Sequence, residues 1–261
     1  MSILVQDYYK VYGQIVAADG ITFSVAPGDI LGLVGPNGAG KTTTLRAMAG
    51  ILVPTRGRIV ISGHDMAKEP VAAKGKLAYV PDDPKLFEQL TVWEHFIFIA
   101  KAYRLSDWVG RANELLATFE LTEKRDSLCS ELSRGMRQKV AICCGYLHQP
   151  KAIMLDEPLT GLDPYGIRSM KSSIRKYAAE GAAIIVSSHL LSLVEDLCTS
   201  VLVLHRGKQL MHASLAEMRQ QLRGAGRQET LEDLFFRLTE GNGHALMPPS
   251  LLPTPSATAG V

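Results

Sequence analysis

Short runs of apolar residues recur along the chain and predict a series of β-strands. The sixth and seventh of these runs are continuously apolar, as expected for strands that are buried on both faces of a sheet. Helical patterns lie between the runs, so we expect an α/β fold with a largely parallel sheet and helical crossovers. In chain order the runs are Ile3–Tyr9, Ile21–Val25, Ile30–Val34, Arg58–Ile61, Leu77–Val80, Ile153–Leu155, Ala183–Ser187 and Val201–His205.

The middle of the chain, residues 91–148, has only helical patterns and is predicted to form a helical subdomain. Thr91 and Glu94 have the spacing of a capping box, which predicts a helix that begins there and ends at Tyr103. Ser106 is predicted to cap a second helix that ends at Phe119. Four aromatic residues are predicted to form the core of this subdomain, and a role in binding a partner protein is the alternative for some of them. They are Trp93, Phe96, Phe98 and Tyr103.

The last part of the chain contains turn and cap signals and then loses its periodicity. Arg206–Gln209 reads as a hairpin turn, and Ser214 and Thr230 are each predicted to start a short helix. Residues 241–261 contain four prolines and no Lys, Arg, Asp or Glu. We therefore expect residues 241–261 to be a disordered tail.

Composition narrows the function classes. The 261-residue chain is 46% hydrophobic, and its net charge is only +2, which argues against nucleic-acid binding as the main activity. The four cysteines form no C-x-x-C pair, so reduced thiols in a cytosolic protein are the expectation. The N-terminus does not read as a signal peptide, and no run reaches the roughly 18 apolar residues that span a bilayer. Any membrane role is therefore expected to depend on a partner.

Glycines are concentrated directly after the run Ile30–Val34, in the stretch G-P-N-G-A-G-K-T-T of residues 35–43. This stretch fits the phosphate-loop pattern G-x-x-x-x-G-K-[ST], whose backbone N–H groups and following helix N-terminus bind phosphates. Lys41 is predicted to reach the β and γ phosphates, and the Thr42 hydroxyl to bind Mg²⁺. The alternative, a chance glycine turn, does not explain the strand before the loop and the helix after it.

Two acidic residues follow the apolar run Ile153–Leu155. Asp156 is predicted to help hold Mg²⁺, and Glu157 to orient and polarise a water molecule against the γ phosphate. The alternative is a solvated acidic turn, which the phosphate loop disfavours. The chain lacks the Asn-Lys-x-Asp stretch by which many GTPases specify guanine, so GTP is disfavoured.

Four further segments, in this order along the chain, resemble the nucleotide-binding subunits of ATP-binding cassette (ABC) transporters. They are Tyr12-Gly13, Leu132–Gln138, Thr160–Pro164 and Ser187–His189. The resemblance covers roughly residues 3–240, and it implies an ABC ATPase domain over residues 1–240 with its helical subdomain at about 91–148. The implied fold is that of a P-loop NTPase, with a mostly parallel core sheet, an antiparallel β subdomain and an all-helical subdomain. The implied ligands are ATP and Mg²⁺.

The resemblance also assigns roles to residues. Tyr12 would stack on adenine, although packing within a strand is the alternative. The Walker A site would consist of Gly35, Pro36, Asn37, Gly38, Ala39, Gly40, Lys41, Thr42 and Thr43. Ser133 and Gly135, in the signature motif, would contact the γ phosphate held by a second subunit, and His189 would contact the γ phosphate as a switch residue. Asp163 would cap the helix that begins at Pro164 and reach across the dimer. Lys41, Glu157 and His189 are thus the predicted catalytic residues.

Two features depart from the usual family pattern. Arg134 and Met136 replace the third and fifth residues of the signature Leu-Ser-Gly-Gly-Gln. Asp82 stands where the family usually has glutamine, and as an oxygen donor it is a predicted Mg²⁺ ligand. Both departures resemble the subfamily of multidrug and ABC-2 type exporters.

The predicted function is therefore that of an ATP-hydrolysing subunit, peripheral on the cytoplasmic face of the membrane. It would power export of a substrate that the sequence does not identify through a separate transmembrane permease. A second ATPase subunit, in a homodimer, would complete each site, and no nucleic-acid partner is expected. The alternatives are an ABC-type ATPase that acts on ribosomes or DNA and a noncatalytic regulatory nucleotide binder. A long coiled-coil insertion or a second cassette, typical of the first alternative, is absent from the sequence.

Overall fold

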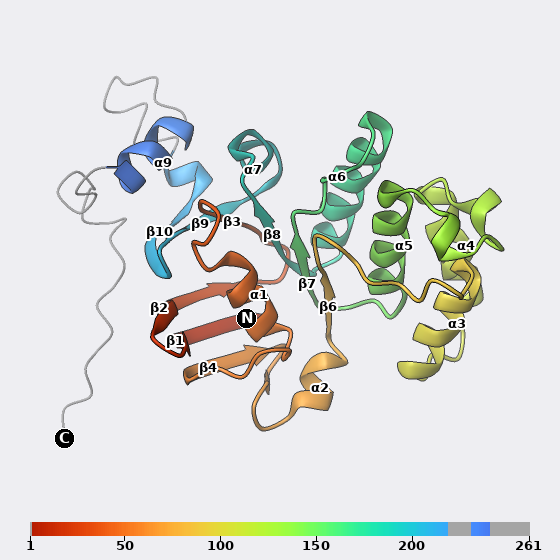
Figure 1. Cartoon of the computed structure of the whole chain (residues 1–261), viewed down its shortest axis with the longest axis horizontal. Helices are drawn as coiled ribbons and strands as arrows, with labels where there is room; N and C mark the ends of the chain where they lie inside the picture. Colours follow the sequence, from red (N-terminus) through yellow and green to blue (C-terminus); the bar gives the residue numbers. More distant parts are fainter. Residues whose placement is uncertain (1, 219–230, 241–261) are drawn as a thin grey trace.

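A computed structural model describes residues 2–218 and 231–240 of the chain (Figure 1). One ten-stranded mixed sheet runs through the molecule, in the order β5-β4-β1-β2-β10-β9-β3-β8-β7-β6. This arrangement confirms the predicted α/β fold class. The predicted cap at Thr230 and the predicted tail at 241–261 lie outside the described residues.

The parallel part of the sheet forms the centre of the fold. Its strands, in spatial order, are β9 (Ser200–His205), β3 (Ile30–Val34), β8 (Ala183–Ser188), β7 (Ala152–Asp156) and β6 (Leu77–Val80). All residues of β3, β7 and β8 are buried, as their continuous apolar character predicts for strands covered on both faces. In-register pairing aligns Val34 with Ser188, and Asp156 with Ser187, at the carboxyl ends of three neighbouring strands.

An antiparallel part flanks this centre. It contains β1 (Ile3–Tyr12), β2 (Ile15–Val25), β4 (Arg56–Ile61) and β5 (His64–Asp65). Strand β10 (Lys208–Ser214) joins the two parts, because it pairs antiparallel with β9 and parallel with β2. The sequence prediction missed β5, β10 and the first half of β2. Next to β10, only a hairpin turn at Arg206–Gln209 was predicted. This turn is confirmed, because β9 and β10 flank residues 206 and 207.

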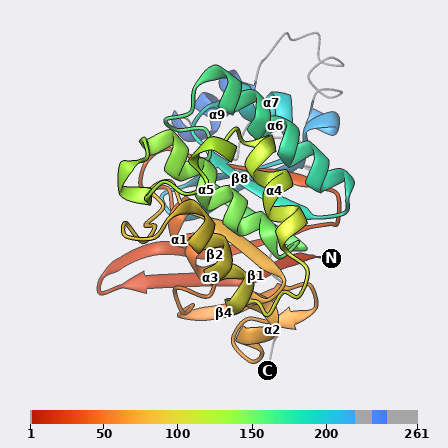
Figure 2. The same ribbon diagram turned by 90° about the vertical axis from the view of Figure 1, so that its right-hand side faces the viewer.

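Helices cover both sides of the sheet, and α3, α4 and α5 gather at one end of the molecule (Figures 1 and 2). In the described chain, the elements of residues 92–147 are helices and 3-10 turns, and Leu128 forms an isolated antiparallel bridge with Thr91. The α-helices are α1 (Lys41–Met48), α2 (Pro70–Lys74), α3 (Val92–Ala102), α4 (Val109–Thr118), α5 (Arg134–Leu147), α6 (Pro164–Ala179), α7 (Leu191–Leu197) and α9 (Leu231–Glu240). The 3-10 turns are η1 (Thr122–Lys124) and η2 (Cys129–Glu131).

The helix caps test the predicted boundaries. The capping box at the start of α3 is confirmed, since Glu94 N donates to Thr91 Oγ1 at 3.1 Å and Thr91 N donates to Glu94 Oε2 at 2.8 Å. The prediction that Ser106 caps the next helix is wrong, because α4 begins at Val109 with Trp108 as its N-cap residue. The indole of Trp108 lies 5.1 Å from that of Trp93, and this packing, not a side-chain cap, fixes the start of α4.

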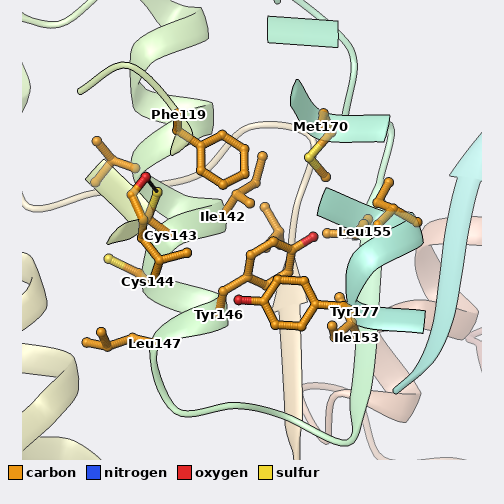
Figure 3. Packing of buried hydrophobic residues seen from close by; sticks show 14 of the residues in the cluster. Phe119, Ile142, Cys143, Cys144, Tyr146, Leu147, Ile153, Leu155, Met170 and Tyr177 are labelled. Atoms are coloured by element: carbon orange, nitrogen blue, oxygen red, sulfur yellow. Dashed lines mark hydrogen bonds between the residues drawn. The ribbon is translucent and has the colours of Figure 1, made fainter. Parts of the chain in front are cut away.

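The largest hydrophobic core lies between the parallel strands and helices α4, α5 and α6 (Figure 3). Tyr146 of α5 is fully buried there, with its ring 4.0 Å from that of Tyr177 on α6. Among the aromatic residues predicted for the helical core, Phe96 is fully buried, and Trp93 and Tyr103 are partly buried. The prediction for Phe98 is wrong: it is 49% exposed, because its position on α3 faces away from this core.

Candidate active site

The phosphate loop joins β3 to α1, and its glycines fit closely against other parts of the chain. A Cβ atom at Gly35 would lie 2.3 Å from the carbonyl oxygen of Leu204, and one at Gly40 would lie 2.6 Å from that of Ala17. Gly38 and Gly40 have φ of 80° and 103°, a region that favours glycine. Gly35 and Gly40 are therefore required because the protein's own backbone approaches them closely. A ligand that approaches the loop would require them as well.

A hollow of about 400 Å³ opens over this loop. Four lining residues that no site motif marks approach the loop from β2 and from the turn after β9: Ile15, Val16, Ala17 and Arg206. Tyr12, the predicted adenine contact, does not line the hollow; it is 44% exposed, and Lys10 Nζ lies 5.0 Å from its ring centre. The full lining consists of Ile15, Val16, Ala17, Pro36, Asn37, Gly38, Ala39, Gly40, Lys41, Thr42, Thr43 and Arg206.

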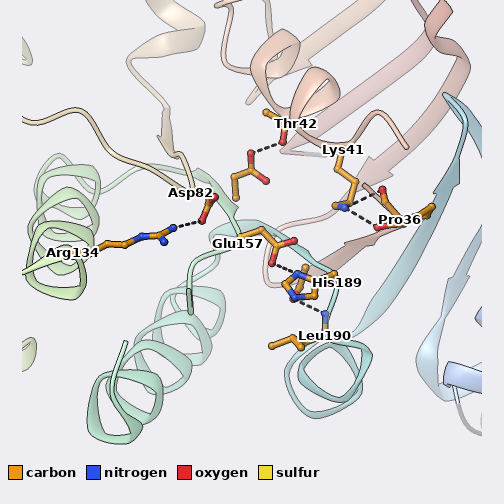
Figure 4. A network of polar contacts seen from close by, with 11 residues as sticks. Pro36, Lys41, Thr42, Asp82, Arg134, Glu157, His189 and Leu190 are labelled. Atoms are coloured by element: carbon orange, nitrogen blue, oxygen red, sulfur yellow. Dashed lines mark hydrogen bonds and ion pairs between the residues drawn. The ribbon is translucent and has the colours of Figure 1, made fainter. Parts of the chain in front are cut away.

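Lys41 is the first residue of α1, and its side chain folds back over the loop (Figure 4). Its Nζ donates to the carbonyl oxygen of Gly35 at 2.7 Å and to that of Pro36 at 3.4 Å. Burial lowers the pKa of Lys41, whereas the nearby carboxylates of Glu157 and Asp156 act in the opposite direction. The ammonium group therefore lies in a concave, partly desolvated loop, where an anionic phosphate would be strongly attracted.

Thr42 and Asp156 meet across the two strand ends. The Thr42 hydroxyl donates to Asp156 Oδ2 at 2.8 Å, and Asp156 is only 3% exposed at the end of β7. The neighbouring Ser187 has a buried hydroxyl oxygen without a hydrogen-bond partner among the described residues. A buried carboxylate, a hydroxyl that contacts it and an unsatisfied hydroxyl fit a hard cation such as Mg²⁺. The family resemblance includes Ser187 in one of its segments but assigns it no role.

Glu157 directly follows β7 in the left-handed backbone region, with φ of 48°. Its N–H donates to the carbonyl of Ser187 at 3.1 Å, and its Oε2 lies 2.9 Å from Nδ1 of His189. The side chain of Glu157 is 17% exposed, and that of His189 is 61% exposed. The turn thus directs Glu157 toward His189, as Figure 4 shows.

The signature segment and the segment after Glu157 pack tightly against each other. Ser133 caps α5, with its Oγ accepting from Met136 N at 3.2 Å. A Cβ atom at Gly135 would lie 2.5 Å from the carbonyl oxygen of Gly161. The predicted cap by Asp163 is confirmed, because its Oδ1 accepts from Gly166 N at 2.6 Å at the start of α6. Met136 therefore still donates its backbone amide, and the departure there changes only the side chain.

Asp82 lies on the segment after β6, and its carboxylate faces α5. Its Oδ1 lies 3.3 Å from Nη2 of Arg134, the first residue of that helix. Figure 4 places Asp82 between Arg134 on one side and the phosphate-loop side chains on the other. Asp82 and Arg134 both depart from the usual family pattern, and the structure pairs them with each other.

A phosphate loop that opens a helix, an acid that contacts the loop threonine, and a second acid held by a histidine together define a P-loop nucleoside triphosphatase. The protein family described as "ABC transporter" matches residues 18–160. The chain belongs to this family and is an ATP-binding subunit, an ATPase that powers transport.

Known relatives agree with this assignment. The "ABC-type transporter ATP-binding protein EcsA" of Bacillus subtilis (strain 168) is 35% identical over 248 residues, which cover 94% of this chain and 100% of that protein. The "Nod factor export ATP-binding protein I" of Paraburkholderia xenovorans (strain LB400) is 34% identical over 203 residues, 77% of this chain and 67% of that protein. A solved "Structure of ATP binding subunit of ABC transporter" superposes with a TM-score of 0.86 at 35% identity, covering 91% of this chain and 99% of that one.

Within residues 2–218 and 231–240, no helix has both the length and the apolar character needed to cross a bilayer.

Proposed function

We propose that this chain hydrolyses ATP to drive export of a substrate through a separate transmembrane permease. The observation that carries the proposal is the convergence of Lys41, the Thr42–Asp156 contact and the Glu157–His189 contact at one edge of the sheet. The name of the relative that serves Nod factor export supports transport out of the cell. The same proposal places the protein on the cytoplasmic face of the membrane.

In this proposal the phosphate loop binds the triphosphate of ATP through its backbone N–H groups. Lys41 leaves the carbonyls of Gly35 and Pro36 and donates instead to the β and γ phosphates. Thr42 and Asp156 would hold Mg²⁺, which when bound neutralises phosphate charge. Glu157 orients and polarises the attacking water, and His189 holds the Glu157 carboxylate in place.

We assign the completion of each site to a second copy of the chain. Ser133 and Gly135 begin α5, which Figure 4 shows across from the phosphate loop, with Asp82 and Glu157 between them. In a head-to-tail dimer, the α5 start of one copy would cover the triphosphate on the other copy, and Asp163 would reach across the same interface. ATP would then favour the closed dimer, because only that state contacts the triphosphate from both sides.

The contact with the permease is assigned to the exposed aromatic residues near the start of the helical segment. Phe87 and Phe98 are 55% and 49% exposed, and their ring centres are 5.3 Å apart. Phe87 N donates to Nε2 of the buried His95, which ties this surface to α3. Exposed aromatic pairs on a rigid support are typical anchors of protein interfaces. The proposed ATPase domain covers residues 1–240, with the helical subdomain at about 91–148.

Affinity purification of the tagged full chain from detergent-solubilised membranes of its own organism tests the permease partner. A multi-spanning membrane protein should copurify, and Phe98→Glu should release it. Val53→Glu provides a matched control, because Val53 is also exposed, at 78%, in the segment between α1 and β4. Copurification of ribosomal proteins or DNA in place of a membrane protein would contradict the proposal.

A further inference from the structure

Asp82 and Arg134 come from segments that are distant in the sequence but adjacent in space. Asp82 follows β6, Arg134 opens α5, and 52 positions separate them. Their 3.3 Å contact is an ion pair. Among the described residues, it is the ion pair in which each of the two takes part. The side chains are 47% and 52% exposed, and ion pairs with this exposure contribute little to folding stability. The role of the pair is therefore better sought in the site beside it.

Arg134 also lies against the segment that follows Glu157. A Cβ atom at Gly161 would be 3.5 Å from Cδ and 3.7 Å from Nε of Arg134. Gly135, the next residue, approaches the carbonyl of Gly161 so closely that a Cβ there would lie 2.5 Å away. The arginine side chain thus spans from the segment after the catalytic acid to the segment after β6.

The neighbouring charged groups have other partners. Arg137 Nη1 donates to the carbonyl oxygen of Leu132 at 2.6 Å, which fixes the backbone just before α5. Asp83 pairs with Lys85, and this contact is the main reason that the pKa of Asp83 is lowered. Within this group, Asp82 is therefore the acid that restrains Arg134.

We propose that Asp82 is a positioning residue for ATP hydrolysis that acts through Arg134 and not as a ligand of the metal ion. The Asp82–Arg134 pair holds the start of α5 at a fixed distance from the segment after β6. Because Arg134 and Gly135 also rest on Gly161, the pair fixes the segment that carries Glu157 relative to the signature residues. This inference rests on the proposed function only in that the chain hydrolyses ATP at the Lys41–Glu157 site.

The two roles of Asp82 predict different responses to two substitutions. Asp82→Asn removes the charge that holds Arg134 but keeps a side-chain oxygen able to bind a cation. Asp82→Ala removes both the charge and the oxygen. If Asp82 acts through Arg134, then Asn and Ala at this position have the same effect as Arg134→Gln. If Asp82 binds the metal ion, Asn is mild, Ala is severe and Arg134→Gln is neutral.

The experiment measures ATP hydrolysis by the purified full chain as a function of ATP and of Mg²⁺. We expect Asp82→Asn, Asp82→Ala and Arg134→Gln each to lower kcat by about three- to tenfold, which lies in the lower part of the range of coupling found for contacting residues. The Mg²⁺ concentration for half-maximal rate should stay unchanged. The double variant Asp82→Asn/Arg134→Gln should be no slower than either single variant, and Asp82→Glu should retain most of the rate.

Asp83→Asn is the matched control, since it removes an acid from the adjacent position whose ion pair is with Lys85 and on which the charge of Arg134 has only a smaller influence, and it should keep the wild-type rate. Unchanged thermal unfolding temperatures would separate positioning from a loss of fold. A raised Mg²⁺ requirement in the Asp82 variants, additive losses in the double variant, or wild-type kcat in Asp82→Asn would overturn the inference. Absence of hydrolysis in the wild-type chain would instead refute the proposed function, and the inference with it.

Discussion

The carboxylate of Glu157 lies 2.9 Å from Nδ1 of His189, and the acid is shielded while the imidazole is open to solvent. The contact joins the residue after β7 to the residue after β8, two neighbouring parallel strands. It therefore fixes the direction of the acid without using the second ring nitrogen. In the proposed switch role of His189, that nitrogen would contact a phosphate oxygen.

Glu157→Gln should reduce steady-state ATP hydrolysis by about a hundredfold or more while nucleotide still binds, because an amide cannot accept a proton from water. Phosphate release and a fluorescent-ATP titration measure the two effects. With saturating ATP and Mg²⁺, size-exclusion chromatography should show this variant as a dimer. Glu180→Gln, at the end of α6, should behave as the wild type. A strictly monomeric Glu157→Gln chain under these conditions would contradict the proposed dimer.

His189→Ala should lower kcat by about tenfold, with a smaller change in KM, because it frees the Glu157 carboxylate from its fixed orientation. Combined with Glu157→Gln, it should add almost nothing, since the two residues act as one unit. His205→Ala, at the end of β9, is the control on a different strand. Full activity of His189→Ala would argue against the positioning role.

Lys41→Ala should weaken ATP binding by about ten- to a hundredfold, the range expected for loss of a charge-assisted hydrogen bond. Lys41→Arg should not restore affinity, because Lys41 is 8% exposed and the loop has little room for the larger guanidinium. A fluorescent-ATP titration gives the dissociation constants. Lys74→Ala, at the end of α2, should bind ATP as the wild type does, and similar affinities for all variants would disprove the role of Lys41.

Two glycines on helices offer a matched pair for stability. Gly135→Ala should destabilise the start of α5, because its Cβ would lie 2.5 Å from a backbone oxygen that cannot move aside easily. Gly110→Ala in α4 meets no atom within 4 Å, and it should stabilise the chain by about 0.5–1 kcal/mol. Urea unfolding compares the two variants. Equal effects would show that the packing of Gly135 on Gly161 is looser than described here.

Acid should destabilise the fold partly through His148. Its ring stacks 3.9 Å from that of Tyr103, and its Nε2 lies 3.0 Å from the carbonyl oxygen of Leu77. Burial lowers the pKa of His148 below the ordinary 6.5. Below that pH the unfolded chain therefore binds a proton that the folded chain does not, and the free energy of unfolding falls as the pH drops.

His148→Gln should make this pH dependence shallower, whereas His64→Gln, at the start of the short strand β5, should leave it unchanged. Urea unfolding at neutral pH and at about pH 5.5 measures the difference. Parallel pH profiles for His148→Gln and the wild type would show that other groups, such as the partly buried His212, dominate.

Sequence patterns predicted the parallel centre of the fold almost to the residue. Strand β3 and strand β6 have the predicted bounds, because continuous apolar runs between helices leave few alternatives. Strand β10 was missed because its residues, Lys208–Ser214, mix polar and apolar side chains in a sheet position that only tertiary contacts define. The start of α4 was missed for a similar reason, since the Trp93–Trp108 contact outweighs a serine cap signal.

For the site, the motifs and the family resemblance assigned roles to residues, which stay predictions, and the structure adds the contacts between these residues. The pairing of His189 with Glu157 and of Asp82 with Arg134 joins segments 32 and 52 positions apart, which no local pattern encodes. Ser187 lies in a segment of the family resemblance that gives it no role, and Val16 lies in no motif. Their importance follows only from register and from the hollow over the phosphate loop.

Strand β10 and the turn before it have a consequence for synthesis of the chain. Gly207 N donates to the carbonyl of Ala39 in the phosphate loop, and Asp19 N donates to the carbonyl of Gly207. The loop near the N-terminus thus gains part of its support from a residue made more than 150 positions later. A nascent polypeptide on the ribosome would therefore complete this support of the nucleotide pocket only after residue 207 has been made, so ATP would meet the complete pocket only after that point.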